Sequence, residues 1–142
     1  MKILVSRCLL GEACRYDGAS KPHPAIQVLA ERHTLIPICP EVDGGLPTPR
    51  IPAERKGERV INQSGLDVTR EYMLGARIAL DTALREGVDC AILKARSPSC
   101  GHGEIYDGSF SRTLISGDGV TAELLLSHGI PVYTEENFPK TL

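Results

Sequence analysis

Three of the five cysteines in this 142-residue chain lie just beyond segments predicted to be strands. Cys8 and Cys39 come within two residues of the ends of the apolar runs 2–6 and 33–38, and Cys100 lies in a Ser- and Gly-rich stretch that follows a third run. A single cysteine at such a position is more often a small buried apolar residue. Three at equivalent positions predict a shared site, because the carboxyl ends of parallel strands border the ligand crevice of an open sheet.

The thiols are expected to be reduced and able to bind metal. Their odd number, and N-terminal residues that lack the apolar stretch of a secretory signal, argue against disulfides and predict a soluble, cytoplasmic protein. Structural zinc sites usually include a closely spaced cysteine pair, whereas Cys8 and Cys14, the nearest pair here, have five residues between them. An iron–sulfur cluster accepts thiolates from several loops, and three thiolates on a four-iron cluster leave one iron open to substrate.

The other two cysteines have different interpretations. Cys14 lies in a turn near Cys8 and could supply a ligand in its place, accept sulfur, or only pack. Cys90 falls inside the predicted strand 89–94, where it is expected to be a core residue with no part in the chemistry. The sequence therefore predicts Cys8, Cys39 and Cys100 as metal ligands, with Cys14 as the alternate.

Oxygen-bearing side chains accompany two of these cysteines. Glu41 follows Cys39 by two residues, at a crevice edge where partial burial suits a carboxyl group that accepts and returns a proton. Its alternative roles are a helix cap or an ion pair with Arg50. Ser97 and Ser99 precede Cys100 and could donate hydrogen bonds to a cluster sulfur or a substrate heteroatom, although a Ser-rich turn without such a role is equally consistent with the sequence.

A repeated Tyr-Asp-Gly triplet occurs in two of the crevice loops. Tyr16 with Asp17, and Tyr106 with Asp107, would each give an aromatic face and a hydrogen-bond acceptor, which together suit a flat heteroaromatic ligand. Two ordinary Asp-Gly turns are the alternative interpretation. No phosphate-binding glycine fingerprint opens a helix in this chain, so we expect neither ATP nor a dinucleotide.

The elements that must position these residues alternate between strand and helix patterns. This alternation, with strands that are apolar throughout, predicts an α/β, single-domain fold with a Rossmann-like parallel sheet and helices on both faces. Asp67 is the expected N-cap of the longest helix, and Gly87 the residue that ends it. The ranges are 2–6, 33–38, 89–94 and 130–133 for strands, 24–32, 68–86 and 119–128 for helices, and 40–59 and 95–111 for long loops.

Composition limits the kinds of partner. An apolar content of 42% over 142 residues is enough for one domain with a buried core. Sixteen Lys and Arg against eighteen Asp and Glu give a net charge of −2, which lacks the basic surplus expected of a protein that binds a long nucleic acid. No apolar run approaches the length of a membrane span, and a small molecule is the expected ligand.

Taken together, three separated motifs resemble the thiouracil desulfidases, a family long catalogued as a domain of unknown function. The resemblance covers essentially the whole chain and implies that residues 1–142 form one desulfidase domain. The motifs are CLLG with CRYDG in 8–18, CPEVDGGLPTPR in 39–50 and LKARSPSCG in 93–101.

The resemblance implies a [4Fe-4S] cluster with three Cys ligands and one open iron. Carried over to this sequence, the ligands are Cys39, Cys100 and an N-terminal cysteine, for which the strand-end argument favours Cys8. Glu41 and Ser97 become the proton-handling pair. The implied reaction removes sulfur from a thiolated pyrimidine such as 2-thiouracil, 4-thiouracil or a thiouridine, replaces it by oxygen from water, and releases hydrogen sulfide without net redox change.

Tyr16, Asp17, Ser99 and Tyr106 are the residues expected to bind this substrate. A free base or nucleoside is the expected substrate, because the chain has neither the additional domain nor the basic surplus expected of an enzyme that acts on transfer RNA. Two alternatives remain at this stage: an iron–sulfur sensor, and a sulfur- or metal-binding module without turnover.

Overall fold

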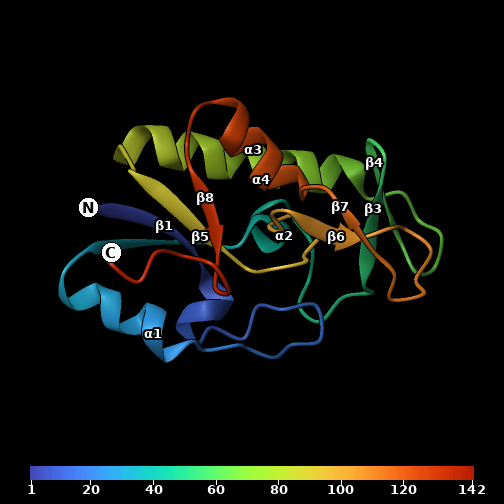
Figure 1. The fold of residues 1–142 in the computed structure, drawn as a ribbon. Coiled ribbons are helices and arrows are strands. Elements are labelled where there is room, and N and C mark those ends of the chain that lie inside the picture. The colour runs from blue at the N-terminus through green and yellow to red at the C-terminus, as the bar shows by residue number, and fades with distance from the viewer.

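The structure, a computed structural model, describes residues 1–142 and is built around one parallel sheet (Figure 1). Four strands pair in the order β2-β1-β5-β8, and every pairing between them is parallel. All four predicted strands are present, the first with the predicted bounds and the other three with shifts of one or two residues at their ends. The strands are β1 (Lys2–Ser6), β2 (Thr34–Ile38), β5 (Cys90–Leu93) and β8 (Val132–Thr134).

Each face of the sheet packs into its own apolar cluster. Leu4, Ala91 and Leu93 lie in one cluster, whereas Ile3 and Ile92 lie in the other, because successive side chains of a strand point to opposite faces. This arrangement explains why the strands are apolar at nearly every position. β2 lies at the sheet edge, which is where a proline such as the exposed Pro37 can be accommodated within a strand.

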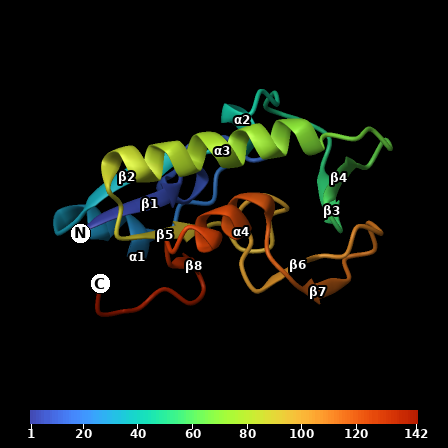
Figure 2. The ribbon, with the colours of Figure 1, turned by 90° about the horizontal axis from the view of Figure 1, so that it is seen from above.

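Helices cover both faces, as predicted (Figure 1), and the view from above shows the helices over one of these faces (Figure 2). The long helix α3 (Thr69–Glu86) and α4 (Val120–Ser127) pack on one face, and α1 (Pro24–Gln27) with the 3-10 turn η2 (Val28–Glu31) packs on the other. α3 ends at Gly87 in the left-handed conformation, as expected of a C-terminal glycine. No helix combines the length and the hydropathy needed to cross a membrane.

Several elements differ from the prediction. The helix expected over 24–32 is only α1 followed by η2, and α3 begins after Val68 rather than after Asp67, although Asp67 Oδ1 still accepts a hydrogen bond from the Thr69 backbone at 2.9 Å. Short elements also form in the segments between the predicted strands and helices, where three or four residues are too few to show a periodic apolar pattern. The added elements are the 3-10 turn η1 (Arg7–Leu10), α2 (Pro40–Asp43), and the antiparallel pairs β3 (Ala53–Lys56) with β4 (Arg59–Asn62) and β6 (Glu104–Tyr106) with β7 (Leu114–Ser116).

Candidate active site

A cavity of about 550 Å³ opens at the carboxyl ends of the parallel strands, where an open α/β sheet binds its ligands. Its walls come from the residues after β1, β2 and β5, from β3, and from the loop that carries Phe110. Four cysteines line it, and the fifth, Cys90, packs inside the sheet core as expected. The four are Cys8, Cys14, Cys39 and Cys100.

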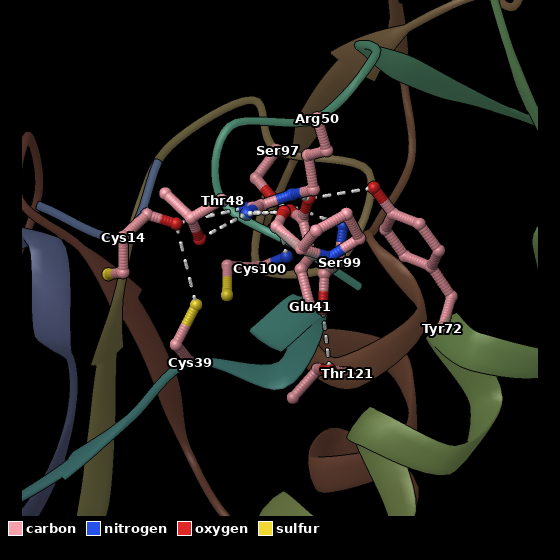
Figure 3. Close-up of polar contacts among 11 residues, drawn as sticks. Cys14, Cys39, Glu41, Thr48, Arg50, Tyr72, Ser97, Ser99, Cys100 and Thr121 are labelled. Atoms are coloured by element: carbon pink, nitrogen blue, oxygen red, sulfur yellow. Dashed lines mark hydrogen bonds and ion pairs between the residues drawn. The ribbon is translucent and has the colours of Figure 1, made fainter. Parts of the chain in front are cut away.

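The cavity thiols are free, buried and contributed by four short segments. Cys8 lies in η1, directly after β1, and Cys39 precedes α2, directly after β2. The Cys39 Sγ lies 3.9 Å from the Cys14 carbonyl oxygen, so the N-terminal loop reaches the end of β2 (Figure 3). The parallel sheet therefore gathers sulfur atoms from positions as far apart in sequence as residues 8 and 100.

Their surroundings raise the pKa values of three of these thiols, Cys14, Cys39 and Cys100, and so hold them in the protonated form. The thiol of Cys39 lowers the pKa of Cys14, but contact with Cys8 and burial outweigh this effect and raise that pKa to about 11. The Cys14 thiol and burial raise the pKa of Cys39 above its usual range. Burial raises the pKa of Cys100 to about 12, although a hydrogen bond with Ser6 acts in the opposite direction.

We expect the metal-free protein to lose stability in alkaline solution. A thiol whose pKa is raised by folding stabilises the fold fully below the unfolded value of 9.0, and this contribution is lost as the pH rises through about 11 for Cys14 and about 12 for Cys100. The free energy of unfolding should fall by roughly 1.4 kcal/mol per thiol for each pH unit between the unfolded and the folded pKa. Urea titrations of the metal-free protein across this range measure the slope. A Cys100→Ala variant should show a shallower slope, and equal slopes would contradict this account.

The thiols of the cavity are donors of the kind that an iron–sulfur cluster uses. No group of three His, Cys, Asp or Glu side chains is arranged to hold one metal ion, which would need ligands about 2.0–2.3 Å from a common point. The four free thiols line the same cavity of about 550 Å³. Thiolates are the ligands that iron–sulfur clusters use.

Glu41 on α2 is the centre of a hydrogen-bond network at the cavity wall (Figure 3). Its Oε1 accepts hydrogen bonds from Arg50 Nε at 3.0 Å and from the Tyr72 hydroxyl at 2.8 Å, and its Oε2 accepts one from Ser97 Oγ at 3.3 Å. The Glu41 and Arg50 side chains are only 15% and 6% exposed. The ion pair with Arg50, which the sequence offered as an alternative role, is therefore present, and Glu41 also faces Ser97.

Ser97 is oriented by its own loop. Its Oγ accepts hydrogen bonds from the backbone N–H groups of Ser99 at 3.1 Å and Cys100 at 3.0 Å. With both acceptor positions of the hydroxyl in use, its proton is directed to Glu41. The structure thus brings the predicted pair, Glu41 and Ser97, into contact across 56 positions of sequence.

Close backbone packing holds α2 against α3. A Cβ added to Gly75 would lie 1.8 Å from the Pro40 carbonyl oxygen, and a Cβ added to Gly44 would lie 2.1 Å from the Glu71 carbonyl oxygen. Only glycine allows two backbones to approach so closely. This contact brings α2, which carries Glu41, against α3, from which the Tyr72 hydroxyl reaches it.

The residues expected to bind substrate divide into two groups. Tyr16 and Tyr106 line the cavity, whereas Asp17 and Ser99 do not. Asp17 is exposed and accepts a hydrogen bond from the Ala19 backbone, so it closes its own turn. Ser99 is fully buried and its Oγ lies 2.8 Å from Thr121 Oγ1, so its side chain joins the loop to α4 instead of facing the cavity.

Two residues of the network were not assigned to the site from the sequence. Tyr72 was expected only on the apolar face of its helix, and Arg50 only as an alternative partner of Glu41. Their distances from Glu41 along the chain, 31 and 9 residues, give no periodic signal. The cavity wall also includes several cationic side chains, namely Arg7, Arg15, Arg50, Lys94, Arg96 and Arg112.

Comparison with known proteins places the chain in one family. A sequence model described as 2-thiouracil desulfurase matches residues 3–137. The uncharacterized protein YbbK of Bacillus subtilis (strain 168) is 45% identical over 143 residues, which covers 94% of this chain and 95% of that protein. A solved structure named [4Fe-4S]-dependent thiouracil desulfidase TudS is 50% identical, with a TM-score of 0.93 over 98% of this chain and 93% of that one. The chain belongs to the 2-thiouracil desulfurase family.

Proposed function

We propose that residues 1–142 form one desulfidase domain that removes sulfur from a small thiolated pyrimidine. In this reaction the thiocarbonyl and water give a carbonyl and hydrogen sulfide, so no electrons are gained or lost overall. The observation that carries the proposal is the placement of Glu41 and Ser97 on the wall of the cavity that four cysteines line. The family to which the chain belongs supports the same chemistry.

We assign the cluster to Cys8, Cys39 and Cys100, with Cys14 as the alternate ligand. These cysteines line one cavity, and their thiol protons must leave when they bind metal. When bound, a [4Fe-4S] cluster with one iron free of protein ligands supplies a Lewis-acidic position for the substrate's sulfur.

The chain's own residues move the protons. Glu41 takes a proton from water through Oε2, the carboxylate oxygen that does not bind Arg50 or Tyr72. Ser97 donates a hydrogen bond to the same oxygen and so keeps it directed along the cavity wall. As the carbon–sulfur bond breaks, both protons of the water pass to sulfur, one of them by way of Glu41, and hydrogen sulfide leaves.

The pyrimidine ring would lie between aromatic and polar walls. Tyr16 and Tyr106 supply aromatic faces at the cavity, and neither Asp17 nor Ser99 belongs to the proposed contact set. A volume of about 550 Å³ is within the range of small-molecule sites and suits a base or nucleoside.

Comparing Cys8→Ala with Cys14→Ala identifies the third ligand. Cys8 follows β1 directly in η1, equivalent to the position of Cys39 after β2, so Cys8→Ala should lose the cluster and Cys14→Ala should keep it. Iron and acid-labile sulfide, measured after identical anaerobic reconstitution, decide between the two. Iron loss only in the Cys14→Ala protein would reverse the assignment.

Turnover under anaerobic conditions tests the proposed function. The reconstituted protein should release sulfide from 2-thiouracil or 4-thiouracil over many cycles. A stable cluster without sulfide release would instead indicate a sensor, and stoichiometric binding of metal or sulfur without release would indicate a binding module. Either outcome would overturn the proposal.

A further inference from the structure

The two oxygens of the Glu41 carboxylate have different environments. Oε1 is held by Arg50 and Tyr72, at 3.0 and 2.8 Å, while Oε2 accepts only the longer contact of 3.3 Å from Ser97 (Figure 3). We propose that Arg50 and Tyr72 are positioning residues, which fix Oε1 so that Oε2 is the oxygen that handles the proton. This inference rests on the proposed function and assigns a role that neither the motifs nor the family description contains.

Tyr72 acts as a rigid donor. Its side chain is 2% exposed in a small cluster with Val60 and Val68, which fixes the ring, and the glycine-mediated contact of α2 with α3 brings Glu41 to its hydroxyl. Burial and the nearby carboxylate of Glu41 raise the pKa of Tyr72 above its usual range, so the phenol keeps its proton. The hydroxyl therefore donates to Oε1.

Arg50 connects the carboxylate to the loop that carries a candidate ligand. While Nε donates to Glu41, one terminal nitrogen donates to the Cys14 carbonyl at 3.0 Å, and the other donates to the Pro47 carbonyl and to Thr48 Oγ1, each at 3.2 Å. The Arg50 backbone N–H also donates to the Tyr16 carbonyl at 2.7 Å. These contacts use the planar, five-donor geometry of the guanidinium, which lysine cannot reproduce.

These contacts fix the orientation of the Glu41 carboxylate in the cavity wall. A carboxylate held at one oxygen by two donors cannot rotate freely, so Oε2 stays beside Ser97 at the cavity wall. General-base catalysis depends on this geometry, and small displacements of a reacting group cost large factors in rate. Loss of either donor should therefore slow turnover without removing the base itself.

Tyr72→Phe is the sharpest test because it removes a single oxygen atom from a buried ring. We expect kcat to fall roughly 10- to 100-fold, with KM and iron content unchanged, since the variant alters the orientation of the base and not the cysteines. Tyr133→Phe is the matched control, because Tyr133 lies on β8 and does not line the cavity. That control should turn over at the wild-type rate.

A double-mutant cycle separates positioning from general structural damage. In a Glu41→Gln background, Tyr72→Phe should cause little or no further loss, because Tyr72 acts through Glu41. The same fold loss in both backgrounds, or full activity of Tyr72→Phe alone, would overturn the inference. Arg50→Lys keeps the positive charge but not the planar, five-donor guanidinium, and it should slow turnover as Tyr72→Phe does.

Crystal structures of the wild-type and Tyr72→Phe proteins give a result that does not depend on turnover. We expect one Glu41 carboxylate orientation in the wild type and rotated or multiple orientations in the variant. An unchanged carboxylate in the variant would overturn the positioning role. Absence of turnover by the wild type would instead overturn the proposed function, so the two failures are distinguishable.

Discussion

Replacing Cys39 or Cys100 by alanine should leave a folded protein that retains no cluster and releases no sulfide. The two residues supply thiols to the cavity from the segments that follow two different strands, so either substitution removes one of the proposed ligands. The wild-type protein should be brown after anaerobic reconstitution and contain about four irons per chain. Iron and acid-labile sulfide analysis of the variants, beside their circular dichroism spectra, measures the effect.

Cys90→Ala is the control for these variants. Cys90 is equally buried but packs in the sheet core and does not line the cavity, so its loss should cost on the order of 1 kcal/mol of stability and no iron. Full iron retention by Cys39→Ala or Cys100→Ala would contradict the proposed ligand set. A colourless wild-type protein that holds one zinc ion would contradict the cluster itself.

Glu41→Gln should reduce sulfide release by about 10²- to 10⁴-fold while the cluster survives, the range typical of a lost general base. The amide preserves the shape of the side chain and removes its ability to accept a proton. Because Glu41 also pairs with Arg50, the variant should be somewhat less stable as well, and thermal unfolding must be measured beside the rate. Binding of 2-thiouracil or 4-thiouridine should persist.

Two other results would assign Glu41 differently. Near-normal turnover would show that the carboxylate only pairs with Arg50 and Tyr72. Loss of iron from the variant would show that Glu41 supports the metal site, which its position two residues after Cys39 permits. The proton-handling role would then pass to Ser97.

The sheet was predictable because its strands are buried on both faces. Such strands are apolar at nearly every position, as in β1 and β5, and this pattern depends on no distant partner. The convergence of Cys8, Cys39 and Cys100 followed from the same pattern, since the carboxyl ends of parallel strands lie at one edge.

The network around Glu41 could not be derived in this way. Tyr72 occupies a helical core position, and its hydroxyl reaches Glu41 only because glycines let α2 and α3 approach closely. The orientation of Ser99 depends on Thr121, which lies on a helix 22 residues further along the chain. The strands of the ribbons β3–β4 and β6–β7 are only three or four residues long, which is too short to show an alternating pattern.

Turnover in water enriched in oxygen-18 tests the central claim most directly. Anaerobically reconstituted protein, without added reductant or oxidant, should convert 2-thiouracil to uracil and sulfide in equal amounts, with oxygen-18 in the new carbonyl. The label follows because the oxygen comes from the water that Glu41 deprotonates. Unlabelled uracil, a requirement for an external electron donor, or no sulfide from protein that carries its full iron content would contradict hydrolytic desulfuration at this site.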